Sequence, residues 1–291
     1  MVVKKDSGTR MCVDFRKVNL HVITDRHPLP RIDQILEELG DAVYLTALDL
    51  LHSFYNLKIN PKDRWKTVFS TPDGHYKFIR LPMGLKNSPA IFQRAMNLLL
   101  QGALGQYAYI YMDDIIIYSR DADSHLKHIE TILEKLQTNG LKVKFSKCQL
   151  FREEIAYIGF LVSLNGMKVN PEKLNAVTHF PQPENVPGIQ AFLGLVGYFH
   201  HFITNFADKA KALYRLLKKE MKFSWTSQQE EAFNLLKNAL VHAPVLAFPN
   251  FDKEFILTID ASGYAIGALL TQVSDENPKA EKLIRDRKSV V

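Results

Sequence analysis

Two adjacent aspartates, Asp113 and Asp114, lie between two short apolar runs, and this stretch constrains the fold more than any other. The runs at 109–112 and 115–118 are rich in β-branched and aromatic residues, which predicts the two strands of a hairpin with the acids at its tip. Neighbouring carboxylates repel each other and lose hydration beside an apolar sheet, so a bound cation would explain the pair. An exposed acidic turn, where Asp is common for backbone reasons, is the alternative.

Other segments place this hairpin in a wider pattern. In chain order they are residues 10–16 (RMCVDFR), 27–33 (HPLPRID), 48–50 (LDL), 81–89 (LPMGLKNSP) and 157–160 (YIGF). Together with the Tyr-Met-Asp-Asp run, they resemble the reverse transcriptases, and are most similar to the Pol polyproteins of gypsy-type LTR retrotransposons. The resemblance runs from about Val2 to Gln272 and fades beyond that residue.

Composition is that of a folded protein with a mild basic excess. The chain has 291 residues, 46% of them hydrophobic, and 37 Lys and Arg against 31 Asp and Glu give a charge of +6. This balance suits a phosphate-rich partner without requiring one. Only Cys12 and Cys148 occur, without paired spacing, so neither a disulfide framework nor a zinc site is expected. With no apolar signal core and no run of about 18 apolar residues, we expect an intracellular protein, cytoplasmic or nuclear, with no membrane partner.

The resemblance implies an α+β fold, that of a right-hand polymerase with fingers, palm and thumb, followed by a truncated RNase H-like α/β piece. Residues 1–165 would form fingers and palm, with the N-terminal fingers incomplete. Residues 166–222 would form the thumb or connector, and residues 223–291 the truncated RNase H-like domain. Prolines 181, 183 and 187 and a helix start at Trp225-Thr226-Ser227 fit these boundaries.

Local signals predict the elements. A capping box is expected between Ser227 and Glu230, and Ser88 is expected to cap a helix with Pro89 in its first turn. Periodicity predicts helices over 32–39 and 126–136, short strands within 2–20, and longer strands over 43–50, 255–260 and 264–272. Turn residues predict two hairpins. One spans 67–79 with Pro72-Asp73-Gly74 as its turn, and the other spans 155–169 with Asn165-Gly166 as its turn.

Asp49 ends the predicted apolar strand over 43–50. The resemblance implies that Asp49, Asp113 and Asp114 hold two Mg²⁺ ions, with Mn²⁺ as a substitute, and catalyse RNA-directed DNA polymerisation. The substrates would be dNTPs and a DNA or tRNA primer annealed to an RNA or DNA template. The alternative for Asp49 is a strand-end residue that caps the segment 51–57.

The resemblance also implies a nucleotide site. Arg10, Lys4 and Lys5 would hold the triphosphate by charge and by the guanidinium fork, with a solvated basic face as the alternative, above all for the two lysines. Phe54 would lie beneath the sugar and exclude a ribose 2′-OH, or belong to the core. The remaining pocket residues would be Met83, Gly84 and Gln93, with core filling as the alternative for Met83.

Three further assignments follow from the same resemblance. Lys147 would protonate the departing pyrophosphate, unless it is simply solvated. Residues Ile158, Gly159 and Phe160 would form the primer grip, where glycine lets the backbone approach nucleic acid closely. Asp260, in a Thr-Ile-Asp-Ala-Ser run, would be the first metal ligand of an RNase H fold.

Two functions remain open on the sequence. The first is a reverse transcriptase, and the second is a truncated retroelement relic that binds nucleic acid without catalysis, since Met1 falls inside the fingers. We expect no RNase H cleavage, because only 31 residues follow Asp260 and the polar run 274–291, with five Lys or Arg, predicts a loose tail. Without a closed sheet, the face bearing Leu269 and Leu270 is expected to be partly exposed. The sequence indicates no oligomeric state.

Overall fold

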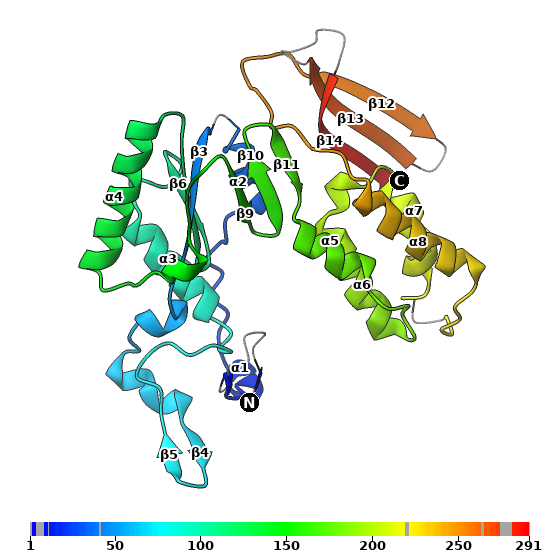
Figure 1. The fold of residues 1–291 in the computed structure, drawn as a ribbon. Coiled ribbons are helices and arrows are strands. Elements are labelled where there is room, and N and C mark those ends of the chain that lie inside the picture. The colour runs from blue at the N-terminus through cyan, green and yellow to red at the C-terminus, as the bar shows by residue number, and fades with distance from the viewer. Residues whose placement is uncertain are drawn as a thin grey trace. The chain divides into compact units, whose positions relative to one another are not determined.

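The computed structural model describes residues 2–3, 9–10, 12–40, 42–218, 221–262, 265–273 and 281–290; side chains at 2–3, 9–10, 260–262, 265–267 and 285–290 lie outside the description. The chain divides into two compact units (Figure 1). The first contains residues 1–35 and 42–153, and the second contains residues 36–41 and 154–291. The division into fingers and palm, thumb and RNase H-like piece stays a prediction.

An antiparallel sheet organises the first unit. Its strand order is β6-β7-β3-β8, with bounds Ala108–Tyr111, Asp114–Ser119, Tyr44–Asp49 and Gln149–Arg152. The predicted hairpin around the two aspartates is therefore β6–β7, and the predicted strand ending in Asp49 is β3. The central strand β7 is the most deeply buried, with Ile115, Ile116 and Ile117 fully covered by neighbouring elements, whereas the end of β8 is exposed.

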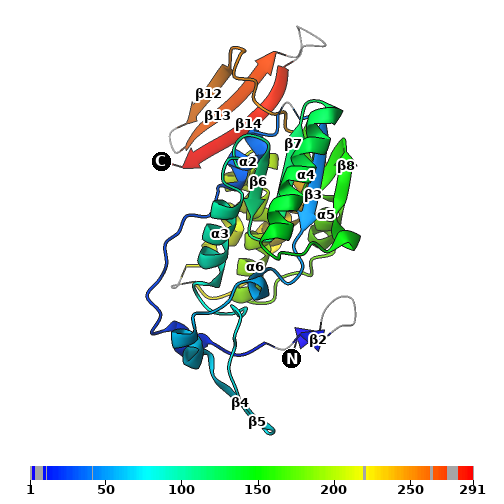
Figure 2. The ribbon, with the colours of Figure 1, turned by 90° about the vertical axis from the view of Figure 1, so that its left-hand side faces the viewer.

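Two helices pack on this sheet. Helix α3 (Ser88–Leu99) contacts β6, and α4 (Ala122–Thr138) lies across β7 and β3 (Figure 2). Their apolar stripes meet the strands in one core, which includes Phe92, Met96, Ile115, Ile117 and Ile132. The predicted helix over 126–136 is confirmed, and it begins earlier because Asp121 caps it by accepting the N–H of Ser124.

The expectation that Ser88 caps α3 is wrong by one residue. Ser88 is the first helical residue, and its Oγ donates to the carbonyl of Pro82 at 2.8 Å. Asn87 precedes the helix, but its side chain bonds the backbone of Ile23 and Asp25 instead of capping. Both polar side chains are thus used to fasten loops that the local sequence does not reveal.

The remaining elements of the first unit are short, and one of them, α2 (Ile32–Glu37), has its last two residues in the second unit. The helix α1 (Arg16–Asn19) corrects the expectation of strands there, because Arg16 folds back onto Asp14 in a bidentate ion pair with a 2.6 Å contact. The predicted hairpin over 67–79 is confirmed, and the predicted helix over 32–39 ends two residues early. Their bounds and those of the other short elements are β1 Val2–Val3, β2 Thr9–Arg10, α2 Ile32–Glu37, η1 Ser53–Asn56, η2 Pro61–Thr67, β4 Phe69–Thr71, β5 Gly74–Tyr76 and η3 Phe145–Lys147.

The second unit begins with a sheet of order β11-β10-β9, formed by Glu154–Tyr157 (β9), Phe160–Ser163 (β10) and Gly166–Val169 (β11). The hairpin over 155–169 is confirmed, but its central turn residues are Leu164 and Asn165, one position earlier than expected. Gly166, at φ 121°, is required, because a Cβ there would lie 2.3 Å from the carbonyl oxygen of Leu246. That oxygen accepts a hydrogen bond from Met167.

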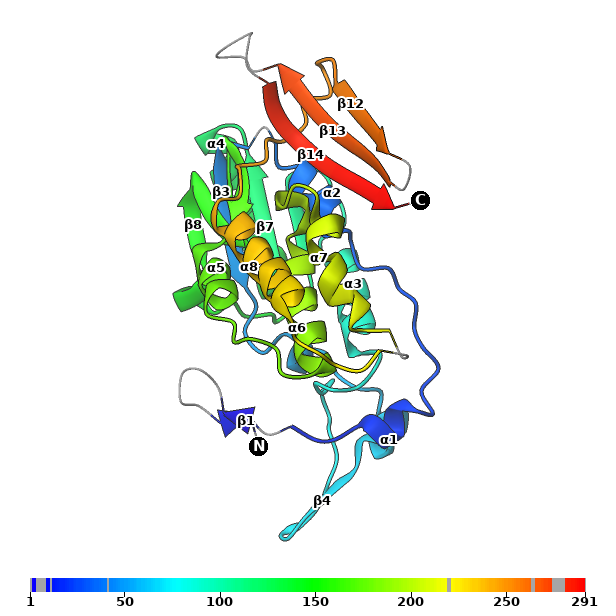
Figure 3. The same ribbon diagram turned by 90° about the vertical axis from the view of Figure 1, so that its right-hand side faces the viewer.

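Helices follow this sheet (Figure 3). They are α5 Pro171–Thr178, α6 Val186–Tyr198, η4 His200–Phe202, α7 Phe206–Arg215 and α8 Ser227–Val241. Their shared core includes Val177, Phe192, Val196, Leu213 and Leu236. The capping box of α8 is shifted by one residue from the expected pair, since Gln229 accepts the backbone N–H of Thr226 and Glu230 accepts Trp225 Nε1.

A third sheet ends the described chain, with order β12-β13-β14 and bounds Ile256–Ser262, Ala265–Val273 and Glu281–Val290. The expectation of a loose tail is wrong for residues 281–290, which pair along the length of β13. Strand pairing, buried Ile284 and a bond from Ala247 N to Leu283 O stabilise it, whereas its own apolar pattern is weak. Leu269 and Leu270 are partly buried, and Leu257 and Ile259 of β12 are 57% and 61% exposed.

No helix in the described parts of the chain is both long enough and apolar enough to cross a bilayer.

Candidate active site at the tip of the β6–β7 hairpin

The turn of the β6–β7 hairpin consists of Met112 and Asp113, between the paired residues Tyr111 and Asp114. Met112 lies in the left-handed region at φ 58°. Residues other than glycine, asparagine and aspartate seldom adopt this conformation, which must be held by surrounding contacts.

Gln93, from α3, holds the turn from beneath. Its Oε1 accepts the backbone N–H of Met112 at 2.9 Å, and its Nε2 donates to the carbonyl of Ile110 at 3.0 Å. Nε2 also donates to Asn97 Oδ1 at 2.9 Å, and Asn97 Nδ2 lies 3.2 Å from His27 Nε2. The amide of Gln93 therefore fixes the end of β6 and the first residue of the turn.

Gln93 was expected to line the nucleotide pocket, yet its side chain is fully buried beneath the hairpin. The sequence does indicate that Gln93 is buried, because it adjoins Phe92 and Met96 on the apolar stripe of the helix, and the structure buries all three side chains fully. A polar residue on a buried helix face needs hydrogen-bond partners. The identity of those partners, 17 and 19 residues away, is visible only in the structure.

Strand pairing brings the three aspartates together. Asp49 is the register partner of Asp114 across β3 and β7, and Leu50 N donates to the carbonyl of Asp113 at 3.1 Å. The three carboxylates therefore leave the backbone at one end of the sheet. Lys147, on η3, reaches the same end, with Nζ 3.2 Å from Asp49 Oδ2.

The charges of the site act against one another. The pKa of Asp114 is raised to about 6, chiefly by partial desolvation and then by the negative charges of Asp113 and Asp49, while Lys147 opposes the shift. A cation would relieve this repulsion. Carboxylate oxygens are the ligands that Mg²⁺ and Mn²⁺ prefer, so the donor set fits either ion. In the described part of the chain, no group of three or more His, Cys, Asp or Glu side chains is placed so that it could hold a metal ion as it stands.

The loop before α3 contains two of the expected nucleotide-site residues, Met83 and Gly84. Gly84 lies at φ 92°, and its carbonyl accepts Asn19 Nδ2 at 2.9 Å while Asn19 Oδ1 accepts Lys86 N at 2.8 Å. Asn19 thus fixes this loop, a role that the sequence did not indicate. The side chain of Met83 is partly buried.

Phe54 lies on η1 and packs edge-to-face against Phe92, with ring centroids 5.3 Å apart. Its side chain is only partly buried, so one part belongs to the core and another remains accessible. Both interpretations of Phe54 are therefore compatible with its position.

For several expected site residues the structure describes only the backbone, or neither backbone nor side chain. Lys4 and Lys5 are outside the described residues, and Arg10 is on β2 with an undescribed side chain. Asp260 is on β12, opposite Gly267 of β13, and its side chain is likewise undescribed. Ile158 and Gly159 form the β9–β10 turn in the second unit, and Phe160 begins β10.

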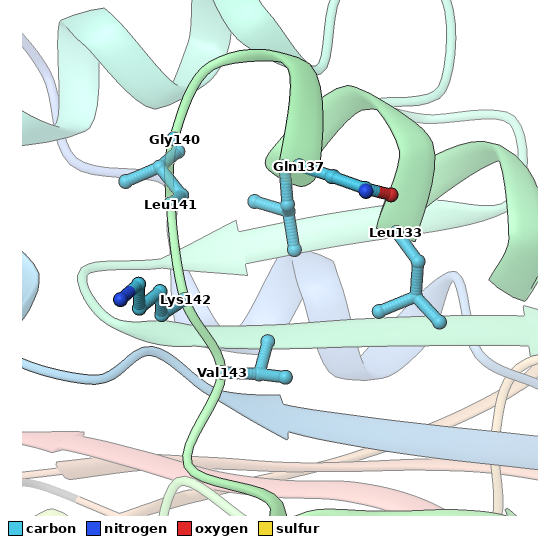
Figure 4. Close-up of a pocket in the computed structure, with 7 residues that line it drawn as sticks. Leu133, Gln137, Gly140, Leu141, Lys142 and Val143 are labelled. Atoms are coloured by element: carbon cyan, nitrogen blue, oxygen red, sulfur yellow. The ribbon is translucent and has the colours of Figure 1, made fainter.

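A separate hollow of about 500 Å³ lies at the end of α4 (Figure 4). Leu133 and Gln137 line it from the helix, and the segment 140–143 lines the other side. Its surface is mainly aliphatic and contains no carboxylate, so it lacks the groups that the aspartate site offers.

Comparison with known proteins agrees with these features. The family described as reverse transcriptase (RNA-dependent DNA polymerase) matches residues 2–162. A second family, the RNase H-like domain found in reverse transcriptase, matches residues 225–284. The resemblance therefore extends beyond Gln272, where the sequence analysis placed its end.

The similar curated proteins are transposon polyproteins. The Pol polyprotein from transposon 297 of Drosophila melanogaster is 42% identical over 265 residues, which cover 90% of this chain and 25% of the relative. The gypsy polyprotein of the same organism is 40% identical, with 90% and 27% covered. The Tf2-3 polyprotein of Schizosaccharomyces pombe is 33% identical, with 95% and 21% covered. The chain thus spans about a quarter of the length of these relatives.

Solved structures of foamy viral protease-reverse transcriptase have the same fold. One, in complex with double-stranded DNA, has a TM-score of 0.87 at 26% identity and covers 99% of this chain and 50% of its own. Another, in complex with an RNA/DNA hybrid, has a TM-score of 0.84 at 27% identity and covers 100% and 39%. The expected α+β polymerase fold is confirmed, and the chain belongs to the reverse transcriptase family.

Proposed function

We propose that this chain catalyses RNA-directed DNA polymerisation. The observation that carries the proposal is the β3–β7 register, which sets Asp49 against Asp114 and places Asp113 in the adjoining turn. Three mutually repelling carboxylates at one sheet end form a site that needs cations to be stable, and nucleotidyl transfer needs cations to screen phosphate charge.

The proposed substrates are dNTPs and a primer annealed to an RNA or DNA template, with DNA or tRNA as the primer. The foamy viral relatives bind double-stranded DNA and an RNA/DNA hybrid, which supports a duplex substrate here. The net charge of +6 also favours a polyanionic partner.

Asp49, Asp113 and Asp114 would hold two Mg²⁺ ions, or Mn²⁺ in their place. When bound, such ions activate the primer 3′-OH and neutralise charge on the triphosphate. The β3–β7 pairing holds the carboxylates at a fixed spacing, and Gln93 fixes the turn that contains Asp113. Most of what the protein contributes is therefore positioning and charge.

Lys147 is the proposed proton donor. Its Nζ lies at the acidic end of the sheet, where it can hold a proton and transfer it to the departing pyrophosphate oxygen. Arg10, with Lys4 and Lys5, would bind the triphosphate, and Met83 and Gly84 would line the pocket. Ile158, Gly159 and Phe160 would contact the primer.

Phe54 is the proposed sugar gate. Replacement Phe54→Val should admit ribonucleotides by opening space for the 2′-OH, while use of deoxynucleotides largely persists. Competition between a ribonucleotide and its deoxynucleotide in primer extension measures this ratio. Unchanged selectivity in an active variant would return Phe54 to a packing role.

The test of the main proposal is primer extension on an RNA template with Mg²⁺. Asp113→Asn should abolish incorporation, because it removes a ligand charge, whereas the matched surface change Asp123→Asn should leave it intact. Equal incorporation by Asp113→Asn, or none by the folded unmodified chain, would refute the proposal. Duplex binding without incorporation would favour the alternative of a nucleic-acid-binding relic.

Absence of RNase H cleavage stays a prediction. Across the sheet, Asp260 of β12 pairs with Gly267 of β13, which in turn pairs with Lys288 of β14. Neither of these residues is acidic, so strand pairing places no second carboxylate beside Asp260. Release of labelled RNA from an RNA/DNA hybrid measures the activity. Cleavage that disappears in Asp260→Asn would contradict the prediction.

A further inference from the structure

The turn between β9 and β10 has an unusual backbone. It consists of Ile158 and Gly159, flanked by the paired residues Tyr157 and Phe160. Their φ angles are 45° and 82°, so both central residues are in the left-handed region, as a type I′ hairpin turn requires. Asn-Gly is the common sequence there. Isoleucine is β-branched and strongly disfavoured at positive φ, so other contacts must impose its conformation.

Those contacts are hydrogen bonds to the carbonyl oxygens of the two turn residues. Tyr198, the last residue of α6, donates its hydroxyl to the carbonyl oxygen of Ile158 at 2.7 Å. The backbone N–H of Asn170 donates to the carbonyl oxygen of Gly159 at 3.1 Å. Both peptide groups of the turn are therefore oriented by partners outside the hairpin, and the one that follows the strained residue is held by a side chain.

The aromatic ring of Tyr198 supports the turn as well. It stacks on Phe160 with centroids 5.4 Å apart and meets Phe199 edge-to-face at 4.9 Å. A Cβ added to Gly159 would lie 3.4 Å from Tyr198 Cε1, so the turn rests directly on the ring. Phe199 is fully buried and fixes the platform, whereas Tyr198 is 40% exposed and lies at its rim.

We propose that Tyr198 is a positioning residue for nucleic acid: its hydroxyl holds Ile158 in the left-handed conformation, and this conformation presents the backbone of the β9–β10 turn to the primer strand. The inference rests on the proposed polymerase function, in which Ile158 to Phe160 contact the primer. Strained backbone that is fixed by its surroundings is common at binding sites, where it preserves one contact geometry.

The first experiment compares Tyr198→Phe with Tyr214→Phe, a matched change at an exposed tyrosine on α7. Tyr198→Phe removes only the hydroxyl and keeps the ring. It should weaken binding of a primer-template duplex, measured without nucleotides, by about three- to tenfold, the usual effect of one hydrogen bond. It should also reduce the nucleotides added per binding event, with the KM for dNTP unchanged. Tyr214→Phe should change neither quantity by as much as twofold.

A second variant connects the effect to Ile158. Asparagine tolerates the left-handed region, so in an Ile158→Asn background the turn no longer depends on the hydroxyl. There, Tyr198→Phe should weaken duplex binding by less than twofold. An undiminished effect would mean that the hydroxyl acts elsewhere, for example on the nucleic acid itself, and would overturn the proposal. Equal binding by Tyr198→Phe and Tyr214→Phe would overturn it as well.

Hydrogen exchange separates this inference from the polymerase proposal. In the free protein, Tyr198→Phe should speed amide exchange at Gly159 and Phe160 and leave exchange in α6 unchanged. Faster exchange and weaker duplex binding in a chain that incorporates no nucleotide would preserve the positioning role while the polymerase proposal fails. Unchanged exchange at the turn, or no duplex binding by the unmodified chain, would overturn the positioning role.

Discussion

The β6–β7 turn and the β9–β10 turn both place an unsuitable residue in the left-handed region, Met112 at φ 58° and Ile158 at φ 45°. Each turn is held by one side chain from a helix, Gln93 of α3 in the first and Tyr198 of α6 in the second. Gln93 is fully buried and bonds two backbone groups of its hairpin, whereas Tyr198 is 40% exposed and its hydroxyl bonds the carbonyl of Ile158.

The difference follows from what each turn presents. The first contains Asp113 and lies beside Asp114 and Asp49, and the proposed cation binding requires their charges to keep a fixed spacing. A buried amide with both its groups bonded provides that rigidity. The second turn has no charged side chain, and in its proposed role it offers only backbone to the primer strand, which fits a support at an accessible rim. A buried polar side chain thus supports the turn proposed for catalysis, and a partly exposed aromatic side chain supports the turn proposed for primer contact.

The largest expected effect is at the first turn. Gln93→Leu keeps the approximate volume but leaves Met112 N–H and Ile110 C=O without their partner. We expect the free energy of unfolding to fall by about 1–3 kcal/mol and single-turnover incorporation to fall on the order of 10²-fold, as a misplaced reacting group does. Urea unfolding and rapid-quench extension measure the two quantities, with the exposed Gln137→Leu as control. Full activity in a destabilised Gln93→Leu would show that Gln93 stabilises the fold without positioning the first turn for catalysis.

The second prediction concerns the sheet behind the first turn, where His125 is fully buried. Its Nε2 lies 2.9 Å from Thr46 Oγ1 on β3, and its Nδ1 lies 2.9 Å from Ser119 Oγ on β7. Ser119 Oγ is also 2.8 Å from His128 Nδ1. With one hydroxyl proton, Ser119 can donate to only one of these rings, so it must accept from the other.

Burial, and secondarily the charge of His128, lowers the pKa of His125 to about 4 from its usual 6.5. Because the unfolded chain binds the proton first, stability should decline as pH falls from about 6.5 to about 4 and then level off. The slope should reach about 1.4 kcal/mol per pH unit for one proton. Urea unfolding across this range should show a smaller slope for His125→Gln than for the exposed control His179→Gln. Equal slopes would contradict a lowered pKa of His125 in the folded protein.

The third prediction compares two glycines at similar φ. Gly159, at 82°, rests against Tyr198, whereas Gly140, at 69° after α4, has no described atom within 4 Å of the position that a Cβ would take. Alanine at either site should lower the free energy of unfolding by about 1–2 kcal/mol, the strain of left-handed backbone. Only Gly159→Ala should also weaken binding of a primer-template duplex. Equal duplex affinity in both variants would contradict a binding role for the β9–β10 turn.

The smallest effect is expected at Asp114, whose side chain is exposed and therefore screened. Its pKa is raised to about 6, so its ionisation disfavours the folded state, and stability is lost as pH rises from about 4 through 6. Without metal, Asp114→Asn should be slightly more stable than the unmodified chain at pH 8 and equal to it near pH 4. Thermal unfolding in a chelator measures this, and a destabilised variant at pH 8 would contradict the repulsion.

Metal affinity should follow the same pKa in the opposite sense. Protons compete with cations for Asp114, so Mn²⁺ binding, measured by paramagnetic relaxation, should weaken as pH falls below about 6. The β9–β10 turn has no such group, and duplex binding through it should change little over this interval. A pH-independent Mn²⁺ affinity would separate Asp114 from the cation site.

The sequence by itself determined the β6–β7 hairpin, the strand ending in Asp49 and the helices that cover them. Alternating β-branched residues and turn residues act within a few positions, so Asp113 and Asp114 could be placed at a tip without coordinates. The family resemblance extended this to the fold. The predicted cap of α8, Ser227, lies one residue after the observed cap, Thr226. Both residue types are suitable caps, and only the complete backbone distinguishes them.

Tertiary structure decided the remaining features. Gln93 and Tyr198 find their acceptors 17 and 40 residues away, and residues 281–290 form a strand because the edge of β13 accepts them, despite their weak apolar pattern. A polar side chain or an edge strand is stabilised by whichever partner the fold brings near. Local periodicity records which residues are buried, but it does not record which distant backbone group completes a hydrogen bond.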